Sequence, residues 1–168
     1  MTSLSADPGP GTSPEEAPRA PRVFDACRDV QELVIGSWWN IDHEAGVGGE
    51  QLFTPGGVCQ MPALTMTGRQ EIGAGYARRQ EAGARISRHL VTNLLVDVAS
   101  DDEAVARYVV VLYAARGTFP ATLTEPQALV DVVDDCVRTD EGWRIRHRRL
   151  ATVFLSDAND SVMLETPS

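Results

Sequence analysis

The chain is poor in cysteine and lacks the cysteine and histidine spacings that hold metal ions. Its three cysteines, Cys27, Cys59 and Cys136, are an odd number without a CxxC pair. They predict neither a disulfide framework nor a zinc knuckle, and free thiols are typical of a reducing cytoplasm. The three histidines form no HxxxH pair, so we expect no metal ion.

Signatures of phosphate binding and of serine hydrolases are also missing. The sequence contains no GxxxxGK[ST] loop and no GxSxG elbow. The glycines between positions 46 and 49 are too weak a signal to indicate a nucleotide site. We therefore expect no cofactor.

Positive charge is scarce, with 15 Lys and Arg against 24 Asp and Glu and a net charge of −9. A nucleic-acid partner is not expected, because phosphate-backbone binding depends on clustered basic side chains. The one basic cluster, at Arg144, Arg146, Arg148 and Arg149, is interpreted as the solvent edge of a strand. No leader segment and no apolar run near the ~18–20 residues of a membrane span is present. We expect a soluble, cytoplasmic protein without membrane contact.

The length of 168 residues suits one domain with a substantial core. Residues 1–22 hold five of the ten prolines among small and polar residues, a composition that favours disorder. Residues 157–168 are expected to form a shorter flexible tail. The folded domain is therefore predicted over 23–156.

The first half of the domain shows helical spacing. Apolar residues over 26–39 recur at i, i+3 and i+4, namely Val30, Leu33, Val34 and Trp38. A turn at 55–57 precedes a short strand predicted over 58–61. Thr67, with Gln70 three residues later, is expected to cap a helix over about 69–82 that carries Ile72 and Tyr76.

The second half alternates with the period of strands. Segments 88–98 and 104–116 predict one antiparallel hairpin, and 129–138 and 143–154 predict a second. The Pro-containing segment 117–127 between them is interpreted as a loop or lid. This order predicts an α+β fold, in which a curved, mostly antiparallel sheet wraps around the N-terminal helices as a cone-shaped barrel.

Two residues far apart in the sequence carry the strongest chemical signal. Asp42 follows the first apolar helix, and His89 opens a long strand. A carboxylate fixes the tautomer of a neighbouring imidazole and raises its basicity, so the two would form an acid/base pair inside one pocket. The alternatives are a helix-capping aspartate and a histidine that only hydrogen-bonds within the sheet.

Other side chains are candidates for contacts with a ligand. Trp38, Trp39 and Tyr113 would supply flat walls, although at least one tryptophan is expected in the core. Asn93, four residues after His89, is expected to share its strand face and to bind a substrate oxygen. Asp134 lies in a Val-rich strand and would face either the cavity or the outside.

Alternation also places His147 and Arg149 on the strand face of Ile145, where either could pair with a carboxylate of the segment 131–135. A structural ion pair is the favoured reading of these charges.

Two segments carry a family resemblance together with the element order: Arg88-His89-Leu90-Val91-Thr92-Asn93 and Gly142-Trp143-Arg144-Ile145-Arg146-His147-Arg148-Arg149. With these features the chain resembles the SnoaL-like branch of the nuclear transport factor two-like superfamily, which includes scytalone dehydratase. The resemblance covers about residues 23–155. It implies that Asp42 and His89 occupy the positions of the facing aspartate and histidine of that branch. A second pocket histidine is missing, because Tyr113 stands near its place, and no carboxylate stands at 60–62, where a ketosteroid isomerase has its base.

The resemblance implies a dehydratase, isomerase or cyclase acting on an apolar cyclic or polyketide-like small molecule, with Asp42 and His89 catalytic. The alternative is a non-catalytic small-molecule-binding or dimerisation module of the same fold. Because the long strands are apolar on both faces, a homodimer through the outer sheet face is expected in either case.

Overall fold

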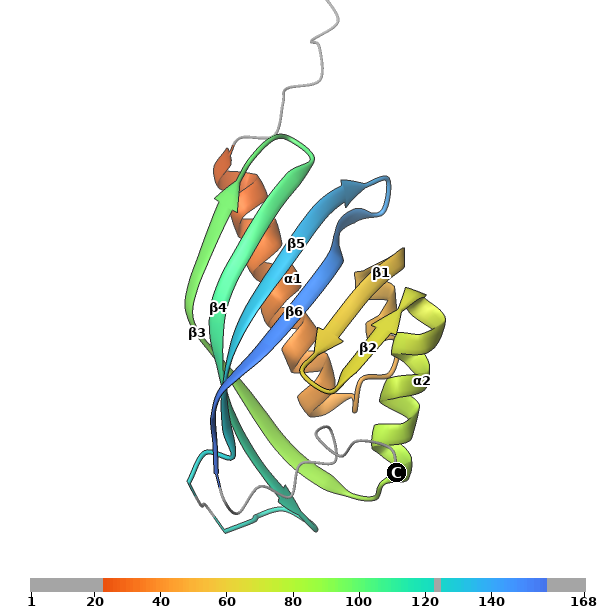
Figure 1. The fold of residues 1–168 in the computed structure, drawn as a ribbon, viewed down its shortest axis with the longest axis vertical. Helices are drawn as coiled ribbons and strands as arrows, with labels where there is room; N and C mark the ends of the chain where they lie inside the picture. The colour runs from red at the N-terminus through yellow and green to blue at the C-terminus, as the bar shows by residue number, and fades with distance from the viewer. Residues whose placement is uncertain (1–22, 123–124, 157–168) are drawn as a thin grey trace, which may run out of the picture.

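The computed structural model describes residues 23–122 and 125–156, which form an α+β domain and confirm the predicted fold class (Figure 1). In chain order the elements are α1 (Val23–His43), the 3₁₀ turn η1 (Gly49–Leu52), β1 (Phe53–Met61), β2 (Leu64–Thr67), α2 (Gly68–Glu81), β3 (Arg85–Val98), β4 (Glu103–Arg116), β5 (Ala128–Thr139) and β6 (Gly142–Leu155). The tails predicted at 1–22 and 157–168 lie outside the described residues. None of the described helices is long and apolar enough to cross a membrane.

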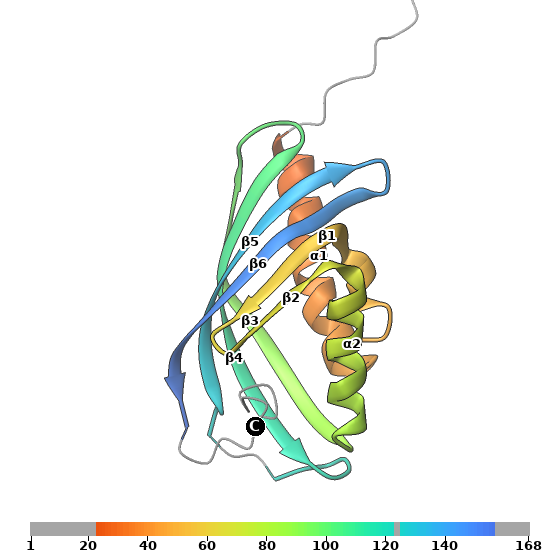
Figure 2. The same ribbon diagram turned by 45° about the vertical axis from the view of Figure 1, so that its right-hand side comes forward.

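The strands form a single six-stranded sheet in the order β2-β1-β6-β5-β4-β3. Both predicted hairpins, β3–β4 and β5–β6, are present, and only β1 and β6 pair in parallel. Figures 1 and 2 show the sheet curving around α1, with α2 packed beside β1 and β2. The sheet does not close, so β2 and β3 remain its edges.

The length of helix α1 determines where Asp42 lies. Its predicted apolar face is buried, and the helix continues to His43, beyond the predicted end at 39. It ends where Ala45 and Gly46 adopt φ values of 53° and 84°, in the left-handed region that terminates helices. Asp42 therefore lies in the last turn, on the side where α1 packs against β3.

Helix α2 buries Ile72 and Tyr76 as predicted. The prediction that Gln70 pairs with Thr67 at the start of this helix is wrong. The Thr67 backbone N–H donates instead to the Glu71 carboxylate at 2.8 Å, and the Thr67 hydroxyl makes no capping bond. Strand β2, directly before this helix, was not predicted, because four residues are too few to display a period.

Three register shifts interrupt the alternation of the long strands, and one of them lies between Leu129 and Val130, at the far end of the β5–β6 pair. The other two decide where predicted residues lie. In β3 the register shifts between Thr92 and Leu95, and in the β5–β6 pair Cys136 stands opposite Ile145 while Asp135 stands opposite His147. A bulge inserts one residue and exchanges the faces of all residues that follow. Both bulges change which side chains reach the interior.

Arg148 is the clearest case. After the β6 bulge its side chain lies on the inner face and is only 2 % exposed. The prediction that all four arginines of the 144–149 cluster form a solvent edge is therefore wrong for Arg148.

Candidate active site

The structure brings Asp42 and His89 into direct contact, although 47 residues separate them. The Nδ1 atom of His89 lies 2.6 Å from Oδ1 of Asp42, and the His89 backbone N–H donates to Oδ2 at 2.7 Å. The Ser87 hydroxyl donates to Oδ1, also at 2.7 Å. Both side chains are nearly buried, at 5 % exposure for Asp42 and 11 % for His89. Three donors from β3 thus hold one carboxylate from α1.

The hydrogen bonds assign the protonation state of the pair. Burial on its own raises the pKa of Asp42, but the hydrogen bonds and charge of His89 and the Ser87 hydroxyl outweigh it and bring this pKa below its usual value. Burial, together with the charges of Arg79 and Arg85, lowers the pKa of His89 more than Asp42 raises it. A carboxylate only accepts hydrogen bonds, so a neutral His89 carries its proton on Nδ1. Its Nε2 then has a free lone pair, the state required of a general base.

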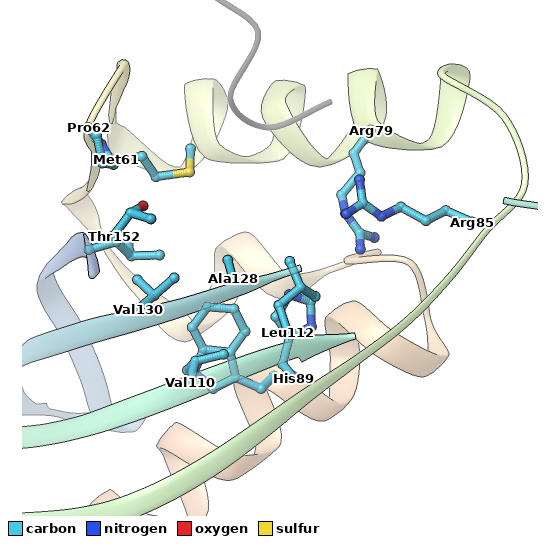
Figure 3. Close-up of a pocket in the computed structure, with 12 residues that line it drawn as sticks. Met61, Pro62, Arg79, Arg85, His89, Val110, Leu112, Ala128, Val130 and Thr152 are labelled. Carbon is cyan, nitrogen blue, oxygen red and sulfur yellow. The ribbon is translucent and has the colours of Figure 1, made fainter. Parts of the chain in front are cut away.

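His89 lines a mostly apolar cavity between the sheet and the helices (Figure 3). Its apolar walls include Met61, Val110, Leu112, Ala128, Val130 and Leu150. The cavity has a volume of about 80 Å³, which is several times the ~10–15 Å³ that one water requires. An apolar cavity with a few convergent polar groups is the usual form of a small-molecule site.

Trp38 forms the wall next to His89. Its ring stacks on the imidazole with centroids 4.7 Å apart and planes inclined by 29°. Its Nε1–H donates to the Tyr108 hydroxyl at 3.0 Å, which fixes the rotation of the indole. Trp38 therefore serves both as core, as expected for one tryptophan, and as cavity wall.

A buried ion pair packs against the ring of Trp38. Arg148 donates to both carboxylate oxygens of Asp134, at 2.8 and 2.6 Å, and Tyr108 donates to the same carboxylate at 2.9 Å. The Arg148 guanidinium also donates to Ser37 and lies 4.8 Å from the Trp38 ring. Asp134 thus faces the interior, where its carboxylate oxygens accept hydrogen bonds from Arg148 and Tyr108. It is not among the cavity-lining residues.

Three predicted ligand contacts lie elsewhere. Trp39 is 62 % exposed and stacks on His43. Asn93 is exposed at the β3 bulge, so the expectation that it shares a face with His89 is wrong. Tyr113 pairs with Arg88, on the opposite face from His89, and lines a separate cleft near residues 119–122. In the strand position opposite His89 stands Leu112.

Three polar residues of the site were not predicted. Ser87 contacts Asp42, and Arg79 donates to the Ser87 hydroxyl at 3.0 Å. Arg79 and Arg85 both line the cavity. The sequence carried a signal for two of them: Ser87 precedes His89 by two residues in a strand, and Arg79 continues the helical face of Tyr76.

Among residues 23–122 and 125–156, no cluster of three His, Cys, Asp or Glu side chains could hold a metal ion. Asp135 and Arg149 form the partly exposed ion pair that was expected on this hairpin, with two hydrogen bonds of 2.8 and 3.0 Å.

Comparisons with known proteins bear on the family and the fold of the chain. The family model described as the SnoaL-like domain matches residues 23–149. The search among curated proteins found no match.

Solved structures with the same fold include an aspartate-to-asparagine variant of a protein of unknown function from Mycobacterium tuberculosis, with 23% identity, 82% coverage of both chains and a TM-score of 0.66. A putative scytalone dehydratase from Novosphingobium aromaticivorans is 21% identical over 77% of this chain and 85% of its own, with a TM-score of 0.66. A Catenulispora acidiphila protein in complex with S-DNPA is 23% identical over 74% of this chain and 91% of its own, with a TM-score of 0.64.

Proposed function

The chain belongs to the SnoaL-like domain family, and from that premise we propose that it is a cofactor-independent enzyme that transfers protons on an apolar, cyclic or polyketide-like small molecule. One observation carries the proposal. His89 is held through Nδ1 by Asp42 at 2.6 Å while its ring lines an apolar cavity. The free Nε2 is then the group available to a substrate.

The reaction begins with removal of a proton from a carbon next to a carbonyl. Nε2 of His89 accepts this proton, and the imidazolium that forms is stabilised by the adjacent Asp42 carboxylate. Return of the proton to a leaving hydroxyl gives dehydration, and return to another carbon gives isomerisation. Attack of the carbanion on a carbonyl carbon of the same molecule closes a ring and breaks the C=O π bond, and the imidazolium then protonates the resulting alkoxide. The putative scytalone dehydratase among the structural neighbours supports the first of these, a lyase.

The walls of the cavity support the chemistry. Val110, Leu112 and Val130 provide no hydrogen bonds, so polar contacts inside are stronger than in water. A flat ring would stack beside Trp38, which is already aligned with His89. The arrangement suits a ring-bearing substrate more than a sugar or a nucleotide.

Proton transfer can be tested without knowing the natural substrate. Cyclic ketones and 1,3-diketones are incubated with the protein in D2O, and exchange of their α-protons is followed by NMR. We expect catalysed exchange in the natural protein and a loss of roughly 10²–10⁴-fold in His89→Gln. His43→Gln, an exposed histidine outside the cavity, is the matched control and should exchange normally.

The outcomes separate the two candidate functions. Equal exchange rates in the natural protein and His89→Gln would contradict the enzyme proposal. Ring compounds that bind in the cavity without any exchange would favour a non-catalytic binding module.

We also propose that the domain forms a homodimer through the outer face of its sheet. Leu90 follows cavity-lining His89 and points outward, Val153 lies at the β5–β6 register shift next to cavity-lining Thr152, and both are 51 % exposed. Sedimentation velocity should show a dimer that dissociates in the double variant Leu90→Asp, Val153→Asp. Val47→Asp, at an exposed position in the turn after α1, should remain dimeric, and a monomeric natural protein would contradict the proposal.

A further inference from the structure

The two arginines of the cavity suggest more about its ligand than the catalytic pair does. Arg79 comes from the last turn of α2 and Arg85 is the first residue of β3, so the short connection between these elements delivers both to one place. Figure 3 shows both side chains reaching toward one end of the cavity, with Met61, Pro62 and Thr152 at the other. The cavity is thus polarised along its length.

Both guanidinium groups act on the catalytic histidine. Although burial is the largest influence on the pKa of His89, the charges of Arg79 and Arg85 each lower it further. Arg79, Arg85 and His89 also line the same cavity. A ligand group bound by the two guanidinium groups would therefore share that cavity with the imidazole.

Arg79 has a second set of contacts that fixes its position. Its Nη2 donates to the Ser87 hydroxyl at 3.0 Å, and Ser87 in turn donates to Asp42 at 2.7 Å. A guanidinium has five N–H donors, so these contacts leave others for a ligand. Within the part of the chain that the structure describes, no acidic side chain lines the cavity.

We propose that the substrate is a ring compound that carries a carboxylate, which Arg79 and Arg85 bind next to His89. The inference rests on the proposed function, because it takes the His89 cavity as the substrate site. Guanidinium groups match the two oxygens of a carboxylate, often with paired hydrogen bonds. The apolar ring lies toward Met61, and the carboxylate orients the carbon that loses its proton toward Nε2. The partly buried site makes such charge-assisted contacts stronger than on an open surface.

Binding of two matched probes tests the proposal. Benzoate and benzamide have the same ring and nearly the same shape but differ in charge. Each is titrated into the full-length protein, and the indole N–H signal of Trp38 is followed by NMR. We expect benzoate to bind at least tenfold more tightly than benzamide.

Variants assign this selectivity to the two arginines. Arg79→Gln and Arg85→Gln should each weaken benzoate binding by about 10- to 100-fold and leave benzamide binding unchanged. Arg79→Lys should restore part of the affinity. Arg78→Gln removes an exposed arginine from the same helix turn and should bind benzoate normally. Arg85→Gln keeps the Arg79–Ser87–Asp42 hydrogen bonds in place, so it tests the inference even if Arg79→Gln fails to fold.

Several results would overturn the proposal. These are equal binding of the two probes, no binding of either, or a loss in Arg78→Gln as large as that in Arg85→Gln. Phenyl phosphate that binds as tightly as benzoate would overturn the assignment to a carboxylate. His89→Gln should keep the selectivity for benzoate while losing proton exchange, so failure of the proposed reaction can be distinguished from failure of this inference.

Discussion

The indole of Trp38 lies on the imidazole of His89, with ring centroids 4.7 Å apart, and its Nε1–H is held by the Tyr108 hydroxyl at 3.0 Å. Tyr108→Phe would leave the buried indole N–H without an acceptor. We expect a loss of about 1–3 kcal/mol in the free energy of unfolding, measured by urea denaturation. Tyr113→Phe is the control on the same strand, and its half-buried hydroxyl makes no hydrogen bond to the described residues. Equal losses in the two variants would contradict a specific role for the Trp38–Tyr108 bond.

The pH dependence of proton exchange should report His89. Burial lowers the pKa of His89 from its ordinary 6.5, and a general base must be neutral to act. The exchange rate should therefore rise with pH through a pKa below 6.5 and be level at neutral pH. Asp42 raises this pKa and Arg85 lowers it. Asp42→Asn should move the acidic limb to lower pH and Arg85→Gln to higher pH. Shifts of the opposite sign would contradict the assignment of His89 as the base.

Neighbouring aspartates on β5 should differ greatly in their effect on stability. Asp134→Asn leaves the fully buried Arg148 without its counter-charge, and we expect a loss of about 3–5 kcal/mol in urea denaturation. Asp135→Asn removes a partly exposed pair with Arg149 and should cost less than about 1 kcal/mol. The double variant Asp134→Leu, Arg148→Met should recover most of the loss. Recovery would show that the cost arises from an unpaired charge, and similar losses in both single variants would rule this out.

The bulge at Asn93 offers a test of backbone conformation. Asn93 has φ of 53°, which asparagine and glycine tolerate and β-branched residues do not. Asn93→Gly should keep the stability within about 1 kcal/mol, whereas Asn93→Val should lower it by roughly 1–2 kcal/mol. The side chain is exposed, so no buried contact is lost in either variant. Thr92→Val, in extended backbone next to it, should be close to neutral in thermal unfolding.

Sequence patterns predicted the elements that repeat a period over many residues. The helical spacing of Val30, Leu33, Val34 and Trp38 located α1, and alternation located all four long strands. The Asp42–His89 contact was also predicted, because the two residues stand at a helix end and a strand start and because the resemblance implies that these positions face each other. These features depend on pattern and element order, which a sequence displays directly.

Faces beyond a bulge could not be predicted in the same way. Counting in twos placed Asn93 with His89, and it placed His147 and Arg149 on the face of Ile145. The structure reverses both, because one inserted residue in each strand exchanges the faces that follow. A bulge has no strong sequence signal here, since neither strand carries a glycine at the break. The arginine end of the cavity was missed for another reason: the convergence of Arg79 and Arg85 depends on how α2 packs against the sheet.

The carboxylate of Asp42 also has a structural role, which does not depend on the proposed proton transfer. It lies at the C-terminal end of a helix, where the helix dipole disfavours negative charge, and it accepts three hydrogen bonds from β3. Among the strands of the described residues, β3 is an edge of the sheet and pairs only with β4. The contact between Asp42 and His89 therefore also joins an edge strand of the sheet to helix α1. Asp42 and His89 would therefore stabilise the domain even in a related chain that lacked the proposed reaction.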